Sequence, residues 1–256
     1  MADPTIRLQD PDLRSRFLRA IDAEARIPAA LQALGPVSDR DVGLLDDPDG
    51  VLSGQLLSLG AWLRRVPDGS SMAALPDGRA DVIVSAWTGF RPGSPDWDEQ
   101  LAQSRRVLRP DGRLLVIHDY GRDEVTGLFE DPARAAERVA WSKPSGPFLG
   151  HGFRVRVLHC WWQWDTQEEA TELLTRSFGE AGAALAAGMR RPRLAWKVAV
   201  YHLAMDLSEV VGADSRAAAA AATKSAAKST KATKRAKIAT TATLPASPEP
   251  SEQAPA

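Results

Sequence analysis

Apolar residues recur along this chain with two periods, and segments of the two kinds alternate as they do in α/β proteins. Residues 42–45, 81–84 and 114–117 are mostly apolar at successive positions, which predicts buried parallel strands. Leucines spaced along residues 52–63, and apolar residues along 97–108, instead follow the period of a helix. Because parallel strands need crossover connections, this order predicts a parallel sheet with helices packed on it.

The flanking segments add further elements. Residues 11–34 predict a leading helical region, with a second segment from Pro28 that ends at Gly35. Ser94-Pro95-Asp96 predicts the start of a helix, because Ser caps, Pro suits the first position and acids suit the positive end of the dipole. Other expected elements are listed by range: a short strand at 64–66, a turn at 109–112, a helix at 132–141, a half-exposed strand at 153–157, a helix from the capping box 166–169 to Gly179, and a last strand at 194–202.

The composition changes sharply near the C-terminus. From Arg216 onward the chain has seven basic and two acidic side chains and almost no large apolar residue. Such a segment cannot bury enough apolar surface to offset the entropy of ordering. We therefore expect a folded domain over residues 1–212 and a disordered basic tail over 213–256.

Charge and cysteine content restrict the protein class. The whole chain has a formal net charge of −1, so the part before the basic tail is acidic, which disfavours a nucleic-acid enzyme. Cys160 is the only cysteine, which excludes an intrachain disulfide and a zinc site built from cysteines. The N-terminus has no apolar signal segment, and no apolar run is long enough to span a bilayer. We expect a soluble cytoplasmic protein without a metal site.

Two motifs carry a resemblance. The first is Leu75-Pro76-Asp77-Gly78-Arg79-Ala80-Asp81, which leads into one predicted strand, and the second is Leu108-Arg109-Pro110-Asp111-Gly112-Arg113, which leads into the next. Together they resemble class I S-adenosylmethionine-dependent methyltransferases, although Asp111 stands where that family has a first glycine. The resemblance implies an α/β, Rossmann-like, doubly wound and mostly parallel sheet of the seven-stranded type. Ligands then bind at the carboxyl ends of the strands.

The resemblance also implies a site for the methyl donor, S-adenosylmethionine. Asp46, Gly50 and Asp68 would hold the donor, and Ser85 and Trp87 would border it. The family has a glycine-rich loop after the first strand, whereas this chain has Asp46-Asp47-Pro48-Asp49-Gly50. Pro48 removes an amide donor and Asp49 adds bulk. The alternative interpretation of these acids is a solvated loop.

Residues for the acceptor follow the strand at 114–117. His118, Asp119 and Tyr120 would face the acceptor, and His118 is the first candidate for a base because its ordinary pKa lies near neutrality. The alternative for His118 is a strand-end histidine whose hydrogen bonds are satisfied.

The segment Trp161-Trp162-Gln163-Trp164 is unusually aromatic. It is interpreted as core packing, with a wall of an acceptor pocket or an oligomer contact as alternatives. Arg190, Arg191 and Arg193 form a solvated loop or contact an anionic acceptor.

Taken together, these patterns favour methyl transfer from S-adenosylmethionine to an unidentified, small-molecule acceptor. The alternative is a catalytically inactive methyltransferase-like protein that binds or scaffolds a partner. A third hypothesis is weak, non-specific contact of the basic tail with nucleic acid through phosphates. The sequence predicts no membrane partner and leaves the oligomeric state open.

Overall fold

The structure is a computed structural model of the whole chain, and it describes residues 10–47, 49–66, 72–129 and 132–205. The described residues all belong to one compact unit, Met1–Asp206. The expected tail, residues 213–256, lies outside the described residues, and so do Pro48 and Asp68.

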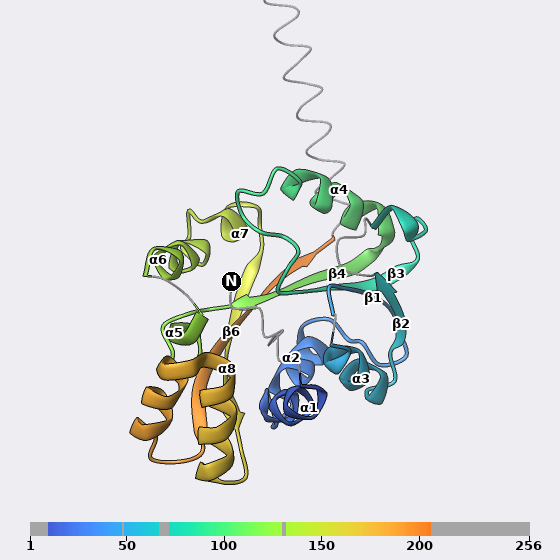
Figure 1. The fold of residues 1–256 in the computed structure, drawn as a ribbon. Helices are drawn as coiled ribbons and strands as arrows, with labels where there is room; N and C mark the ends of the chain where they lie inside the picture. The colour runs from blue at the N-terminus through green and yellow to red at the C-terminus, as the bar shows by residue number, and fades with distance from the viewer. Residues whose placement is uncertain (1–9, 48, 67–71, 130–131, 206–256) are drawn as a thin grey trace, which may run out of the picture. The chain divides into compact units, whose positions relative to one another are not determined.

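Helices and strands alternate along the chain (Figure 1). The strands are β1 Asp41–Leu45, β2 Trp62–Val66, β3 Ala80–Ala86, β4 Leu108–Asp119, β5 Arg154–Gln163 and β6 Arg193–Ala204. The helices are α1 Pro11–Ala20, α2 Arg26–Leu34, α3 Val51–Ser58, α4 Trp97–Val107, α5 Thr126–Phe129, α6 Pro132–Trp141, α7 Pro147–Gly150 and α8 Gln167–Gly188, with a 3-10 turn, η1, at Met72–Ala74.

The six strands of the described residues form one sheet in the order β2-β1-β3-β4-β6-β5. β2, β1, β3 and β4 are parallel, whereas β6 lies antiparallel between β4 and β5. The order reverses between β1 and β3, because β2 follows β1 on one side and β3 pairs with it on the other. Such a switch point leaves a crevice at the carboxyl ends of the two strands. There Leu45 of β1 pairs with Ser85 of β3.

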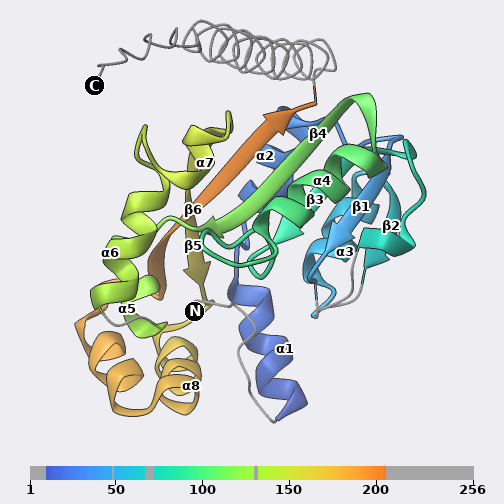
Figure 2. The ribbon, with the colours of Figure 1, turned by 90° about the horizontal axis from the view of Figure 1, so that it is seen from above.

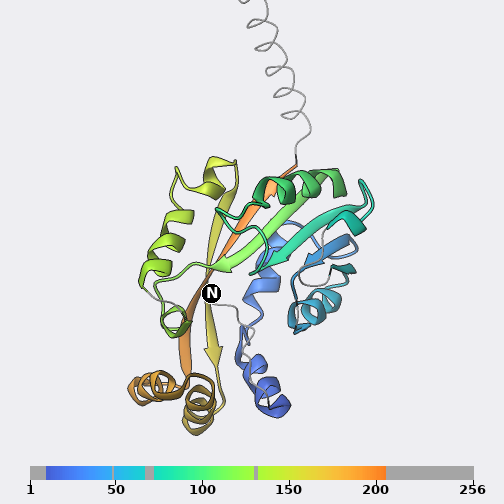
Figure 3. The same cartoon turned by 45° about the horizontal axis from the view of Figure 1, so that its top comes forward.

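Each face of the sheet carries its own core and its own helices. One core contains apolar residues of α1, α2, α3 and α8, and the other contains residues of η1, α4 and α7. Figures 1 and 3 show α4, α6 and α7 on one side of the sheet and α1, α2, α3 and α8 on the other. Figure 2 shows α1 and α8 at the end of the sheet toward which β4 and β5 point. The molecule is thus a three-layer α/β domain.

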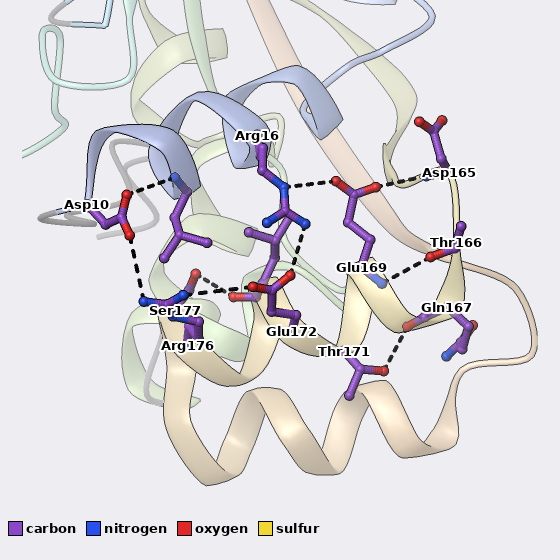
Figure 4. A network of polar contacts seen from close by, with 12 residues as sticks. Asp10, Arg16, Asp165, Thr166, Gln167, Glu169, Thr171, Glu172, Arg176 and Ser177 are labelled. Atoms are coloured by element: carbon purple, nitrogen blue, oxygen red, sulfur yellow. Dashed lines mark hydrogen bonds and ion pairs between the residues drawn. The ribbon is translucent and has the colours of Figure 1, made fainter.

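α1 and α8 contact each other through charged residues as well as through the core. Arg16 of α1 donates to Glu169 at 3.3 Å and to Glu172 at 2.9 Å, as Figure 4 shows. Arg176 of α8 lies 3.7 Å from Asp10, which caps α1. These exposed pairs align two helices that the apolar contacts already hold together.

The aromatic segment of β5 is mainly core, which confirms that interpretation. Trp162 and Trp164 are 1% and 4% exposed, and both pack edge-on against Phe17 of α1, with ring centroids 5.0 and 5.9 Å away. Trp161 points to the other face because side chains alternate along a strand. The Arg193 guanidinium lies 4.1 Å from the centre of its ring. Trp162 and Trp164 therefore fix α1 onto the sheet.

Several predicted boundaries are wrong, and each error has a local cause. The second helical segment begins at Arg26 rather than at Pro28, because the buried Asp22 carboxylate accepts bonds from the amides of Arg26 and Ile27 and so caps α2. The next helix ends at Ser58, so that Leu63 belongs to β2 rather than to a helical stripe.

Two further helix boundaries also differ. α4 begins after Asp96 rather than after Ser94, because the Ser94 hydroxyl donates to the Asp96 carboxylate instead of capping the helix. Gly179 interrupts α8 without ending it, since its φ of 59° and ψ of −135° only kink the helix, which runs on to Gly188.

The expected turn at residues 109–112 is an irregularity inside β4. The pairing of β3 with β4 shifts register between Ala80 and Val82 as the strand passes this segment. A Cβ at Gly112 would lie 2.9 Å from the Arg109 carbonyl oxygen. Gly112 is therefore needed because the backbone approaches closely, rather than to reverse the chain.

Candidate functional site

A cavity opens where β1 and β3 end, at the switch point of the sheet. It has a volume of about 370 Å³, which lies within the size range of small-molecule sites. Its lining comes from the ends of β1 and β3, from η1 and from α4: Leu45, Asp46, Met72, Thr88, Gly89, Phe90, Asp96, Glu99, Gln100 and Gln103. The crevice that the sequence located is therefore open, rather than filled by side chains.

The three carboxylates of the acidic loop after β1 have different surroundings. Asp47 accepts a hydrogen bond of 2.8 Å from the Ser53 amide and so caps α3. Asp49 forms an ion pair with Arg14 of α1. Asp46, with a left-handed φ of 62°, is the acid of this loop that lines the cavity. Only one of the three acids is thus placed to meet a ligand there.

The loop after β3 forms the opposite wall, and its backbone is unusual. Trp87 and Phe90 have φ values of 64° and 52°, although neither is a glycine. Ser85 Oγ and Thr88 Oγ1 are buried and have no hydrogen-bond partner among the described residues. Backbone strain and unsatisfied buried hydroxyls are uncommon and gather at functional sites. Their concentration beside the cavity marks this loop as part of a site.

The cavity favours positive charge. Its lining has three carboxylates, those of Asp46, Asp96 and Glu99, and no lysine or arginine among the described residues. The hydrogen bond from the Ser94 hydroxyl lowers the pKa of Asp96, which keeps this group ionised at neutral pH. Gln100 and Gln103 add amide groups that can donate or accept hydrogen bonds. A ligand with a cationic centre and polar edges suits these walls.

The structure brings together some of the predicted donor residues. Asp46 lines the cavity, and Ser85 lies directly behind Gly89 of its wall. Gly50 stands at the N-cap of α3 with a φ of 71°, outside the cavity lining. Trp87 packs in the core on the α1–α3 and α8 face of the sheet, where its ring stacks on Trp196 with the ring centroids 6.0 Å apart.

The sequence reasoning missed the α4 contribution to the site. Glu99, Gln100 and Gln103 lie within little more than one turn of α4, whose buried residues are Trp97, Leu101, Ser104 and Val107. The spacing was readable from the sequence, but a polar helix face ordinarily faces solvent. Nothing in the sequence indicates that η1 and the β3 loop enclose that face.

His118 lies in the core beside the site rather than in the cavity. Its ring is 3% exposed and packs against Trp141 and Phe148, with ring centroids 5.2 and 5.9 Å away. Burial lowers the pKa of His118 to about 3, so the ring is neutral at physiological pH. Nε2 lies 3.3 Å from the Phe90 carbonyl oxygen, which can only accept, so Nε2 carries the proton. The role of His118 as a base stays a prediction.

Asp119 is buried in a polar cluster of its own. One carboxylate oxygen accepts from Arg138 of α6 at 2.7 Å, and the other accepts from the Trp196 indole at 2.8 Å. Burial raises the pKa of Asp119 to about 6, against the opposing effect of Arg138. Tyr120 follows at the strand end and donates its amide to the Lys197 carbonyl. The roles of Asp119 and Tyr120 toward an acceptor stay predictions too.

The described residues contain neither a metal-binding cluster nor a membrane-spanning helix. No group of three or more histidine, cysteine, aspartate or glutamate side chains there could hold a metal ion. No helix in the same part of the chain is long and apolar enough to cross a membrane.

No family model and no curated protein matches this chain. Solved structures do match. A protein assigned as a type II methyltransferase from Anaeromyxobacter dehalogenans is 17% identical, with 70% of this chain and 96% of that chain covered and a TM-score of 0.44. A SAM-dependent methyltransferase from Aquifex aeolicus is 18% identical, with 75% and 93% covered and a TM-score of 0.41.

A third structure was solved with ligands. Geranyl diphosphate C-methyltransferase from Streptomyces coelicolor A3(2), in complex with S-adenosyl-L-homocysteine, is 11% identical, with 70% of this chain and 76% of that chain covered and a TM-score of 0.37. The class of this protein follows from its own sheet, whose order reverses between β1 and β3 with helices on both faces. It is a Rossmann-like, doubly wound α/β domain, as the sequence predicted.

Proposed function

We propose that this chain transfers a methyl group from S-adenosylmethionine to a small-molecule acceptor. The observation that carries the proposal is the cavity at the β1–β3 switch point, with three carboxylates and no basic residue in its described lining. S-adenosylmethionine carries a sulfonium and an ammonium group, and both suit an acidic wall. The strand-end position is the one at which doubly wound folds bind their ligands.

The residues present fit such a donor on two observations. Thr88 Oγ1, in the cavity lining, is a buried hydroxyl without a partner in the described structure, so a hydrogen-bonding ligand would relieve an existing energetic cost. Gly89 lies so close to Ser85 and Asp46 that a side chain would close this wall. Asp46 and Glu99 would hold the cationic groups, and Thr88 and Gln103 would orient the polar edges.

The bound donor would supply an already activated methyl group. The chain therefore needs mainly to align the acceptor with that methyl group and to exclude water. An acid or base is required only where the acceptor carries a proton that must leave.

Calorimetry with the purified full chain tests the donor site. We expect S-adenosylmethionine and S-adenosylhomocysteine both to bind, and S-adenosylmethionine to bind more tightly because only it carries the sulfonium charge. Asp46→Asn should weaken the binding of S-adenosylmethionine by about tenfold, because one charge-assisted hydrogen bond is lost.

The matched control is Asp111→Asn. Asp111 is an exposed aspartate in the irregular segment of β4, and it contacts a different cavity, lined by Arg109 and Arg113. This variant should bind as the parent protein does. Absence of binding heat for both ligands at millimolar concentration would reject the enzyme and leave the alternative, a methyltransferase-like binding protein.

A further inference from the structure

The loop between β3 and α4 places Thr88 and Gly89 in the cavity wall and is held at Phe90 by two side chains. Phe90 is fully buried and adopts a left-handed backbone conformation. Such a conformation is strained for an aromatic residue, so the surroundings must enforce it.

Both backbone groups of Phe90 are bound by side chains from neighbouring elements. The Phe90 amide donates to Gln100 Oε1 of α4 at 2.6 Å, and its carbonyl accepts from His118 Nε2 of β4 at 3.3 Å. The side chain of Gln100 is oriented by Asp96, whose carboxylate accepts from Gln100 Nε2 at 2.6 Å. The ring of His118 is fixed between Trp141 and Phe148.

The other end of the same loop is fixed on the opposite face of the sheet. The Trp87 amide donates to the Ile117 carbonyl at 2.9 Å, and the Trp87 ring stacks on Trp196, whose indole is bound to Asp119. Thr88 and Gly89 thus lie between two residues whose conformations are imposed by the end of β4 and by α4. Their position in the cavity wall depends on both attachments.

We propose that His118 and Gln100 are positioning residues, which clamp the Phe90 backbone and thereby hold the cavity wall in the shape that binds the donor. The donor part of this inference rests on the proposed function, but the clamp itself does not. The burial of His118 and its engagement with a carbonyl group favour this role over proton transfer.

Hydrogen–deuterium exchange of the ligand-free protein tests the clamp directly. His118→Phe keeps an aromatic ring in the core but loses the donor, whereas His118→Gln keeps a donor. We expect exchange in residues 86–92 to rise by about five- to tenfold in His118→Phe, as for the loss of one hydrogen bond, and to be largely restored in His118→Gln. Peptides from α1 and β5 should exchange at the parental rate.

A second pair of variants avoids substitution in the core. Gln100→Ala should accelerate exchange in the same loop. Gln103→Ala, one turn further along α4, should not, because the Phe90 amide is bound by Gln100 whereas Gln103 accepts from Arg106 at 2.9 Å. If His118→Phe does not fold, this pair of variants still tests whether the Phe90 backbone is held by side chains.

Ligand affinity completes the test. S-adenosylhomocysteine should bind His118→Phe and Gln100→Ala about tenfold more weakly than the parent, with His118→Gln near the parent. Parental exchange in residues 86–92 of both His118→Phe and Gln100→Ala would overturn the proposal. If the parent binds no ligand while the exchange results hold, the proposed function fails and the clamp stands.

Discussion

Asp46 and Gly89 face each other across the switch point, and Asp46 Oδ2 lies 3.0 Å from the position that a Cβ on residue 89 would occupy. Ser85 Oγ lies closer still, at 2.5 Å from the same position. The two residues are 43 positions apart in the sequence, and they meet because β1 and β3 are neighbours in the sheet. A side chain at residue 89 therefore requires Ser85 or Asp46 to move.

Gly89→Ala should close the cavity wall. The added methyl group meets Ser85 and Asp46, so we expect the free energy of unfolding to fall by roughly 1–3 kcal/mol. We also expect S-adenosylmethionine to bind at least tenfold more weakly. The control is Gly54→Ala in α3, where a Cβ meets nothing within 4 Å. That variant should gain about 0.5–1 kcal/mol, because alanine favours a helix. Equal stability changes for the two variants, measured by urea denaturation, would contradict this packing.

The stability of the protein should depend on the protonation of His118 in acid. Its pKa is about 3 in the folded chain and near 6.5 when unfolded. Because only the unfolded chain takes up this proton, the contribution is complete above pH 6.5 and is lost as the pH falls toward 3. The free energy of unfolding should fall by about 1.4 kcal/mol for each pH unit in this window.

Substitution isolates that dependence from the effect of other groups. His118→Gln should lack this loss, so the unfolding free energy of the parent relative to the variant should fall by about 1.4 kcal/mol for each pH unit between pH 6.5 and pH 4. His159→Gln, at an exposed position on β5, is the control for replacing a histidine at the surface. A parallel offset for His118→Gln across this range, measured by urea denaturation, would show that the folded ring takes up the proton normally.

Breaking the buried ion pair should destabilise the domain strongly. Arg138 and Asp119 are 10% and 1% exposed at the side chain, and removal of either leaves a buried charge or polar group without its partner. We expect Arg138→Leu to lower the free energy of unfolding by roughly 3–5 kcal/mol. Arg176→Leu, from the exposed pair with Asp10, should change the melting temperature little. Similar melting temperatures for the two variants would show that the buried pair contributes no more than a surface one.

The tryptophans of β5 should differ according to the face on which they lie. Trp162→Ala leaves a cavity against Phe17 and should cost roughly 3–5 kcal/mol. Trp161→Ala removes a stacked guanidinium contact with Arg193 and should cost about 1 kcal/mol or less. Chemical denaturation of the two variants measures both changes. A larger loss of unfolding free energy for Trp161→Ala than for Trp162→Ala would contradict the placement of Trp162 in the core.

The sequence by itself determined the elements whose pattern is local. Residues 81–84 and 114–117 lie in strands because their apolar runs are buried, and Thr166 begins α8 because its hydroxyl accepts from the Glu169 amide three residues on. These features depend on neighbouring residues along the chain, so the sequence alone can predict them. Their order predicted a parallel sheet with helices packed on it, and the resemblance to methyltransferases implied the doubly wound class.

Only the tertiary structure decided which residues meet. β6 inserts antiparallel between β4 and β5, and no periodicity in residues 193–204 specifies that choice. The pairing brings Trp196 to Asp119, and the winding of α4 over the sheet brings Gln100 to Phe90. Contacts between residues far apart in the chain depend on the packing of whole elements. For this reason the sequence located the edge of the sheet that carries the site, whereas the folded chain decided which side chains line the cavity and which hold its walls.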